Sequence, residues 1–361
     1  MSLYVDIHVL QTVPPSCVNR DDTGSPKTAR YGGVTRARVS SQAWKRAVRL
    51  MFLELLSKEQ VGVRTKKIVG MVAKEIDPAI LKGTQGDLFG AEPGEPSPEA
   101  MKQAEKLLTA AGLKIKDAEK GTDALFLMSP GQAKALVKVD LAQKEKELKK
   151  ACQEALMEAP SVDMALFGRM VADDPSLNFD AACQVAHAIS THAVQNEFDY
   201  FTAVDDCAPE DNAGAGHLGT VEFNSSTLYR YATVNACALE KNLHADTPQA
   251  IRAFVEAFVR SMPTGKQNTF ANRTLPDAVV VMLREDQPVN LCGAFEKPVA
   301  AKEDDGYGYV EASKKALCDY AKQVQDYVPA PAKTLKVGPD GTLPQVLDKL
   351  EAEVKERLGA E

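Results

Sequence analysis

The apolar positions of the first fifty-odd residues follow two different periods. Aliphatic side chains alternate with polar ones over residues 3–10, and a similar alternation over residues 34–39 predicts a second strand. From residue 42 the spacing becomes that of a helix, with Trp44 and Met51 on the apolar face. Two serines precede this stretch, where a hydroxyl can cap the first amides of a helix. We therefore expect a strand, a polar loop, a second strand and a helix in this order.

Residues 58–160 carry a helical pattern with one long interruption. Apolar side chains recur at helical spacing around residues 59–75 and 99–111, and again over residues 131–158. The sequence GTQGDLFGAEPGEPSP, residues 83–98, separates the first two stretches, and its prolines and glycines predict a connector. We expect the whole block to form a helical insertion.

The second half of the chain alternates helical and β-type patterns. A stretch rich in Thr, Val, Phe and Tyr, residues 220–236, alternates like a β-ribbon. Strands are expected at residues 228–235, 278–284 and 291–299, and helices at residues 179–192, 247–262 and 343–358. This order of elements predicts an α+β fold with an antiparallel sheet, a helical insertion and an exposed ribbon.

Positive charge is concentrated near the N-terminus of a chain whose net charge is −7. Residues 1–53 have a net charge of +5, which leaves −12 for the remainder, and residues 23–53 contain no Asp or Glu. A solvated helix face is the ordinary explanation for a few such cations, whereas a dense cluster can bind phosphates by releasing their counterions. The acid-free stretch holds Lys27, Arg30, Arg36, Arg38, Lys45, Arg46 and Arg49. This density favours a polyanionic partner.

The same sequence argues against several other classes of protein. The first ten residues lack the basic start of a signal peptide and no apolar run could span a bilayer, so we expect a cytoplasmic protein. The seven cysteines include no Cys-x-x-Cys pair, so we expect neither a metal nor a redox site. His187 and His192 are five residues apart and are expected to be neutral core or interface histidines. Residues 214–219 match a dinucleotide-binding glycine pattern, but acidic residues precede them, so no such cofactor is expected.

A set of short motifs is spread along most of the chain. The most specific are PSCVNRDD at residues 15–22 and YGGVTRARVSSQAWKRAVR at residues 31–49. Shorter ones are IHVL (7–10), GRM (168–170), HAISTH (187–192), FTAVDD (201–206), AGHLGT (215–220), EF (222–223) with LYRYA (228–232), and AFEK (294–297). Together they resemble the CasC-type backbone subunit of the type I-E CRISPR Cascade complex.

This resemblance implies a protein shaped like a right hand. Residues 1–57 and 181–361 would form a ferredoxin-like (RRM-type) palm, residues 58–180 helical fingers, and residues 194–223 a protruding β-ribbon thumb. In such complexes six copies stack head to tail along a CRISPR guide RNA, and each thumb displaces one nucleotide while the others remain available for pairing with target DNA in antiviral defence. The implied partners are guide RNA, target DNA, further copies of the chain and other Cascade subunits, with no membrane.

The resemblance also implies a set of binding residues and no catalytic residue. Met170, after Gly168 and Arg169, would act as a wedge at the RNA kink, and the thumb residue Phe201 would hold an unstacked base. The RNA cradle would further contain Asn19, Arg20, Lys27, Arg38, Ser40, Ser41, Gln42, Lys45, Arg46, Arg49, Lys266 and Gln267. The fingers would meet DNA through Lys144, Lys146, Lys149 and Lys150. Because acids interleave with these four lysines, a solvated, salt-bridged face is the favoured alternative for them.

An enzymatic alternative depends on Asp205 and Asp206. Carboxylate pairs can hold Mg²⁺, and related backbone subunits of type III effectors cleave RNA with a thumb aspartate. Asp199 would be a third candidate ligand. Adjacent aspartates in an acidic loop more often shape turns, so a non-catalytic RNA-binding subunit is the leading hypothesis.

Overall fold

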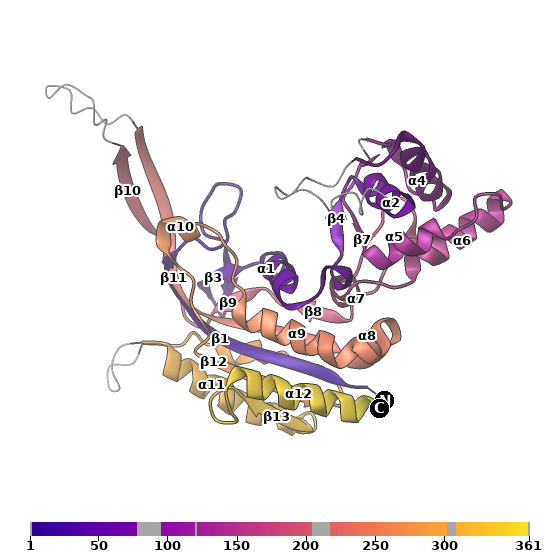
Figure 1. Ribbon diagram of the computed structural model, residues 1–361. Coiled ribbons are helices and arrows are strands. Elements are labelled where there is room, and N and C mark those ends of the chain that lie inside the picture. Colours follow the sequence, from indigo (N-terminus) through magenta and orange to yellow (C-terminus); the bar gives the residue numbers. More distant parts are fainter. Residues whose placement is uncertain (1, 78–94, 120, 204–216, 302–307, 360–361) are drawn as a thin grey trace, which may run out of the picture. The chain divides into compact units, whose positions relative to one another are not determined.

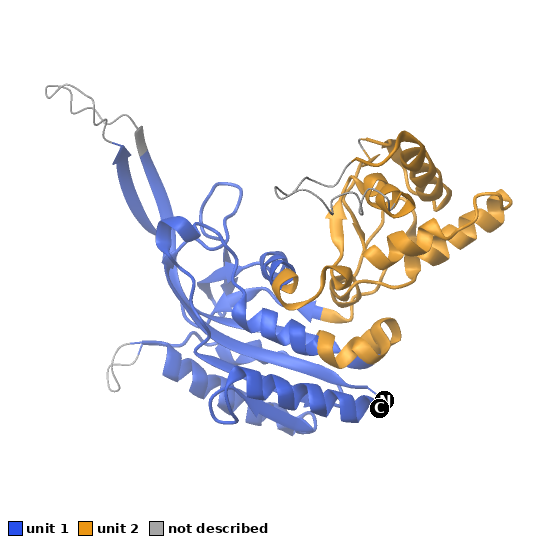
Figure 2. Ribbon diagram, viewed as in Figure 1, with its two compact units in different colours: residues 1–51, 184–237, 251–361 blue, residues 52–183, 238–250 orange. Residues whose placement is uncertain are grey.

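The computed structural model describes residues 2–77, 95–119, 121–203, 217–301 and 308–359. The chain forms two compact units, shown in Figure 2. Unit 1 comprises residues 1–51, 184–237 and 251–361; unit 2 comprises residues 52–183 and 238–250. The predicted insertion, residues 58–180, lies within the first segment of unit 2, but the unit also takes in residues 238–250, which the sequence had not grouped with it.

Unit 1 is built on a large antiparallel sheet. Its strands follow the order β13 (Lys333–Lys336), β12 (Ala278–Arg284), β1 (Tyr4–Ser16), β11 (His217–Asn235), β9 (Ala188–Ser190), β3 (Val34–Val39) and β2 (Thr28–Tyr31). Two further strands, β8 (Cys183–Val185) and β10 (Glu197–Ala203), pair with β11. The predicted α+β class with an antiparallel sheet is confirmed.

The first strand is central in this sheet and longer than its sequence pattern predicted. β1 pairs antiparallel with β11 on one side and with β12 on the other, so that Ile7 lies between Ala232 and Val281. Its polar side chains Asp6, His8 and Gln11 are buried together with its aliphatic ones. Asp6 is accommodated because its carboxylate accepts hydrogen bonds from the Tyr231 hydroxyl and the Val289 amide, both at 2.9 Å, although burial still raises its pKa.

Helices complete unit 1. They are α1 (Ser41–Leu55, whose last turn belongs to unit 2), α9 (Thr247–Arg260, whose first turn does), α10 (Gln267–Phe270), α11 (Val310–Gln323) and α12 (Leu343–Leu358), with 3-10 turns η4 (Leu291–Phe295) and η5 (Val324–Asp326). The predicted apolar face of α1 is confirmed, since Trp44, Val48 and Met51 are buried. Trp44 lies under the guanidinium of Arg230, 3.6 Å from its carbon to the ring centre, which fixes α1 to β11.

Strands β10 and β11 form a two-stranded ribbon that projects from the sheet (Figure 1). The pairing runs from Glu197 opposite Phe223 to Ala203 opposite His217. All seven residues of β10 are exposed, in contrast to the buried half of β11 within the sheet. An exposed β-ribbon is thus present where the sequence predicted one.

Unit 2 packs helices around an apolar core of its own. The helices are α2 (Ile68–Ile76), α4 (Pro98–Ala110), α5 (Pro130–Val137), α6 (Glu145–Met157), α7 (Val162–Phe167) and α8 (Ala236–Leu243, which begins in unit 1), with 3-10 turns η1 (Lys58–Gln60), η2 (Pro175–Leu177) and η3 (His244–Asp246). Two small antiparallel pairs accompany them: β4 (Val63–Thr65) with β7 (Phe126–Met128), and β5 (Ile115–Asp117) with β6 (Gly121–Thr122).

Four predicted elements are wrong. The helix expected around residues 59–75 is confirmed only from Ile68 onward, because Val63–Thr65 form β4, which pairs with β7. Residues 179–192 form β8 and β9 in place of a helix, because the edge of β11 supplies their backbone partners. Residues 291–299 begin with the 3-10 turn η4 in place of a strand, and the side chain of Asn290 caps this turn by accepting from the Cys292 amide at 3.0 Å. The helix predicted over residues 131–158 is two helices, because Asp140 turns the chain by accepting from the Ala142 amide.

Candidate nucleic-acid interface

Four predicted RNA-binding residues of unit 1 are connected by hydrogen bonds around Asn19. The Asn19 side-chain oxygen accepts from the Ser40 amide at 2.9 Å, and its backbone oxygen accepts from the Lys27 amide at 2.8 Å. The Lys27 carbonyl in turn accepts from the Arg38 amide at 2.9 Å. The loop after β1 is thereby held against the junction between β3 and α1. Asn19 belongs to one motif, Arg38 and Ser40 to another, and Lys27 lies between the two motifs; the fold places all four side by side.

The start of α1 lies at this junction. The Ser40 hydroxyl accepts from the Ala43 amide at 3.3 Å, so Ser40 is the helix cap and is largely buried. Ser41 is half-buried and Gln42 is exposed on the first turn. The uncapped amides of a helix start are favourable donors to phosphate oxygens. Arg46 is exposed on the next turn, and Lys45 and Arg49 are half-buried beside it.

A turn before α10 brings two further predicted residues to the same loop. A Cβ at Gly265 would overlap the carbonyl oxygen of Val18, so only glycine allows this close approach. Lys266 follows in a left-handed conformation, with φ of 51°, and Gln267 begins α10. Burial raises the pKa of the Cys17 thiol, while the charges of Arg20 and Lys266 lower it, which places both cations near this thiol.

The loop after β1, the start of α1 and the turn before α10 form a cationic surface of unit 1. Its members Arg20, Lys27, Arg38, Arg46 and Lys266 are largely unopposed by acids. Of the residues that the structure describes, no carboxylate lies within ion-pair distance of Arg20, Lys27, Arg38, Arg46 or Lys266. The neighbouring Asp21 is engaged within its own loop. It accepts from the Thr23 hydroxyl at 2.7 Å, the Thr23 amide at 2.9 Å and the Ser25 amide at 3.0 Å, and these bonds lower its pKa.

One cation of the predicted cluster does not belong to this surface. The guanidinium of Arg36 is fully buried and donates to the carbonyl oxygens of Tyr31 (3.1 Å), Ser190 (3.1 Å) and Phe295 (2.7 Å). Burial lowers its pKa. Arg36 therefore connects β3 to its surroundings, and the sequence was wrong to count it with the clustered cations. The alternation of side chains along β3 did not reveal that Arg36 is buried, because both faces of the strand are covered at this point.

Arg169, which was predicted to contact RNA in unit 2, is also a structural cation. Only 5% of its side chain is exposed. The guanidinium donates to the carbonyl oxygens of Leu127, Leu156 and Leu177, and it lies between the rings of Phe126 and Phe179. Burial lowers its pKa to about 10. These contacts give Arg169 a structural role within unit 2, and its predicted contact with RNA stays a prediction that its burial argues against.

The neighbours of Arg169 have the opposite character. Gly168 has a φ of 77°, and a Cβ there would lie 2.8 Å from the carbonyl oxygen of Phe179, so the chain turns sharply at this glycine. Met170 follows with 88% of its side chain exposed. An exposed, unbranched apolar side chain after a sharp turn is suited to insertion between bases. Its role as a wedge stays a prediction.

The ribbon of unit 1 carries exposed aromatic side chains. The ring of Phe201 lies over Gly219 of the opposite strand and leaves 40% of its surface exposed. Phe198 and Tyr200, which alternate with it along β10, are more exposed still. The acidic pair of the enzymatic alternative, Asp205 and Asp206, lies outside the described residues, and Asp199 is exposed on β10.

His187 belongs to the cationic surface, although the sequence placed it in a core or an interface. Its ring is exposed, and its Nδ1 lies 3.3 Å from a guanidinium nitrogen of Arg38. Partial burial lowers its pKa first, followed by the charges of Arg38 and Lys27. The prediction is confirmed for His192, whose buried ring accepts from the Thr227 amide at 3.1 Å. Only the pairing of Arg38 with Ile189 across β3 and β9 brings His187 to the cations.

The predicted DNA-binding lysines lie in and before α6 of unit 2, and all four are exposed. Lys149 lies 3.9 Å from the Asp174 carboxylate and Lys150 lies 3.6 Å from that of Glu154. Lys144 precedes the helix and Lys146 lies in its first turn. Two of the four lysines are thus opposed by acids, as the salt-bridged alternative predicts.

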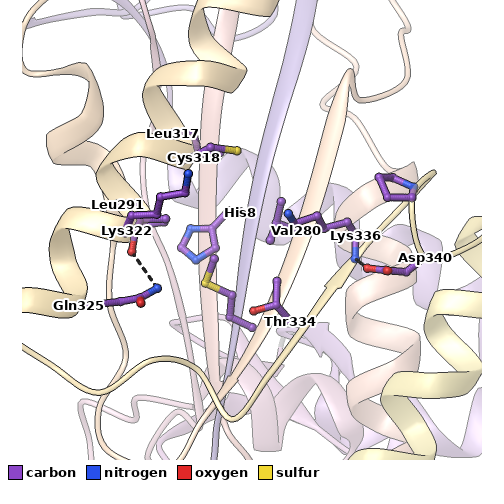
Figure 3. A pocket seen from close by; sticks show the side chains of 13 residues that line it. His8, Val280, Leu291, Leu317, Cys318, Lys322, Gln325, Thr334, Lys336 and Asp340 are labelled. Atoms are coloured by element: carbon purple, nitrogen blue, oxygen red, sulfur yellow. Dashed lines mark hydrogen bonds between the residues drawn. The ribbon is translucent and has the colours of Figure 1, made fainter.

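A cleft of about 430 Å³ in unit 1 was not predicted (Figure 3). It is lined by residues of α11, β12 and β13, with Lys322 and Lys336 on either side of His8. His8 is buried and its pKa is lowered to about 3, so its ring is neutral at physiological pH.

Among the described residues, no three His, Cys, Asp or Glu side chains are grouped to hold a metal. Within the residues that the structure describes, no helix is long and apolar enough to cross a membrane.

Comparisons with known proteins cover nearly the whole chain. The model of the CT1975-like protein family matches residues 5–358. A solved chain described as "CRISPR RNA-guided surveillance complex, pre-nicking" is 32% identical with a TM-score of 0.76, and the match covers 98% of this chain and 99% of that one. Another, described as "CRISPR RNA-guided surveillance complex", is 28% identical with a TM-score of 0.59 and the same coverage. Among curated proteins, none matches in sequence.

Proposed function

We propose that this chain, which belongs to the CT1975-like protein family, is a guide-RNA-binding backbone subunit of a CRISPR surveillance complex. Its likeness to solved chains of such complexes supports a role in Cascade-type assemblies. The observation that carries the proposal is the cationic surface of unit 1. Three separate chain segments meet there, and five of its cations have no carboxylate partner among the described residues.

The chemistry of this surface fits a guide of any sequence. Lysine and arginine side chains and the amides at the start of α1 bind phosphate oxygens, which are the same for every nucleotide. Specificity in an RNA-guided complex comes from base pairing, so a subunit that read the bases of the guide would be a disadvantage. The exposed Met170 and Phe201 supply apolar surface that holds an unstacked base without identifying it.

The connectivity of unit 1 supports the proposal of a ferredoxin-like palm. Along the chain, β1, α1, β9, β11, α9 and β12 occur in this order, with other elements inserted between them, as strand, helix, strand, strand, helix, strand. In the sheet these strands are ordered β12, β1, β11, β9. This order matches the βαββαβ arrangement expected of the proposed ferredoxin-like palm, and the ribbon that extends β11 would be the thumb. Unit 2 would then supply the fingers.

We further infer that copies stack head to tail along the guide and leave most bases free to pair with target DNA. A heterologous interface between identical chains produces filaments, which suits a long RNA. Six copies and the type I-E subtype follow from the resemblance alone. Other subunits of the complex would close the two ends, and the exposed lysines 144 and 146 would be the first candidates for contact with DNA.

The experiment that tests this role is co-purification. The chain, expressed in cells that transcribe its CRISPR array and the other subunits, is expected to retain an RNA of one uniform length. Sequencing of that RNA should return repeat and spacer sequences. Purification of the chain with no RNA, or with RNA of random length and origin, would contradict the proposal.

A non-catalytic role is part of the proposal, and the enzymatic alternative is tested separately. Guide and target RNA are incubated with the chain and Mg²⁺, with the Asp205→Ala/Asp206→Ala variant as the control. We expect both proteins to leave the RNA intact. Cleavage by the wild type that is lost in the variant would establish a metal-dependent ribonuclease.

A further inference from the structure

His187 lies beside Arg38 and Lys27, two cations that are proposed to bind phosphate. Its Nδ1 is 3.3 Å from the guanidinium of Arg38, and because arginine can only donate, Nδ1 must be the acceptor. The neutral ring therefore carries its proton on Nε2. A second guanidinium hydrogen bond, from Arg38 Nε to the Thr28 carbonyl at 3.1 Å, fixes the arginine in this position. The ring is thus oriented beside two of the residues proposed to hold RNA.

The charges around His187 are all positive. Arg38 of β3 and Lys27 of the segment before β2 are the charged groups that act on it, and no carboxylate of the described residues contributes. Partial burial and both cations lower the pKa of His187 below its ordinary value, so the neutral form of the free ring is favoured at pH 7. A phosphate that arrives between them reverses this balance, because an anion nearby favours the protonated form of histidine.

From this arrangement we propose that His187 is a further RNA-contacting residue, which takes up a proton when a phosphate of the guide binds beside Arg38 and so makes RNA affinity depend on pH. The inference rests on the proposed function. The neutral ring can offer the phosphate one donor, Nε2–H. The protonated ring offers two, and its Nδ1–H replaces the hydrogen bond that Arg38 donated to it with one to the phosphate.

The sign of the effect follows from linkage. RNA raises the pKa of His187 above its value in the free protein, so the complex binds more protons than the free protein does. Affinity must therefore rise as pH falls through the bound-state pKa. A phosphate within hydrogen-bonding distance shifts such a group by about one unit, so we expect affinity to increase roughly three- to tenfold per copy from pH 8 to pH 6.

The test measures binding of the full chain to a fluorescein-labelled, 30-nucleotide single-stranded RNA of mixed sequence by fluorescence anisotropy. The pH is varied from 6 to 8 at constant ionic strength. His187→Gln keeps a polar side chain that can donate but cannot gain charge. His244→Asn is the matched control, because His244 is an exposed histidine outside the cationic surface and its left-handed backbone tolerates asparagine. Circular dichroism confirms that each variant is folded.

We expect the wild type and His244→Asn to gain affinity on acidification, and His187→Gln to bind with the wild-type affinity of pH 8 at every pH. Calorimetry in two buffers of different ionisation enthalpy should show proton uptake at pH 7 that His187→Gln lacks. An unchanged pH response in His187→Gln, or a flat response in the wild type, overturns this inference and leaves the proposed function intact. A wild-type chain that fails to bind RNA at either pH overturns the proposed function itself.

Discussion

At the scale of single residues, burial distinguishes cations that hold the protein together from cations available to a partner. Arg36 and Arg169 both lie in motifs that the sequence singled out, yet carbonyl oxygens surround both guanidinium groups. Arg20 and Arg46 are exposed and have no such partners among the described residues. A motif therefore marks a position that matters without saying whether it matters for folding or for binding.

The adjacent residues Arg169 and Met170 provide the clearest test of this distinction. Arg169→Ala leaves several buried carbonyls without donors, so the free energy of unfolding should fall by roughly 3 kcal/mol in urea titrations. Met170→Ala removes an exposed side chain and should change stability by less than about 0.5 kcal/mol while weakening RNA binding. Normal stability of Arg169→Ala with reduced RNA affinity would instead make this arginine an RNA contact.

At the scale of elements, the sequence predicted best where one segment determines its own structure. The bounds of β3, β12 and α12 agree with the predicted ranges, because each has a complete apolar face and clear flanking turns. Residues 179–192 have helical composition but form strands, since their partner strand lies some forty residues further along the chain. The same contrast between local pattern and distant pairing explains which residues of the candidate site the sequence could predict. Asn19 and Arg38 were found from motifs and Lys27 from the acid-free stretch around them, whereas the adjacency of His187 depends on strand pairing.

The turn that carries Lys266 gives a prediction at this scale. Gly265→Ala places a methyl group against the carbonyl oxygen of Val18, so the turn must move away from the loop after β1. RNA affinity, measured by anisotropy, should fall at least as much as in Lys266→Ala, and the melting temperature should fall as well. Gly70→Ala in α2 is the control, since open space surrounds Gly70 and alanine favours the helix. Wild-type affinity in Gly265→Ala would exclude the turn from the RNA surface.

At the scale of the whole molecule, the distribution of charge is unusual. A net charge of +5 in the first 53 residues is set within a chain of −7. The acidic remainder repels nucleic acid at other surfaces and so limits non-specific binding, while the local cluster retains attraction for the guide. In the proposed assembly, identical subunits bound along one RNA would multiply a modest affinity per copy.

Multi-copy binding predicts that stoichiometry follows RNA length. In native mass spectrometry, loaded complexes should gain whole subunits as the single-stranded RNA is extended from 12 to 24 and 36 nucleotides. The Arg20→Ala/Lys27→Ala variant should show lower occupancy on every RNA. One subunit per RNA at all three lengths would contradict head-to-tail assembly.

The salt dependence of RNA binding tests the central claim most directly, namely that the cationic surface of unit 1 grips phosphates regardless of sequence. Each phosphate contact to a single strand contributes about 0.7 to the slope of log affinity against log salt. Arg20→Ala/Lys27→Ala should therefore reduce the slope by about 1.4 for RNAs of different sequence alike. Lys322→Ala/Lys336→Ala, which removes two exposed lysines of the cleft in Figure 3, should leave the slope unchanged. Equal slopes for the wild type and Arg20→Ala/Lys27→Ala, or slope changes that depend on the RNA sequence, would contradict the claim.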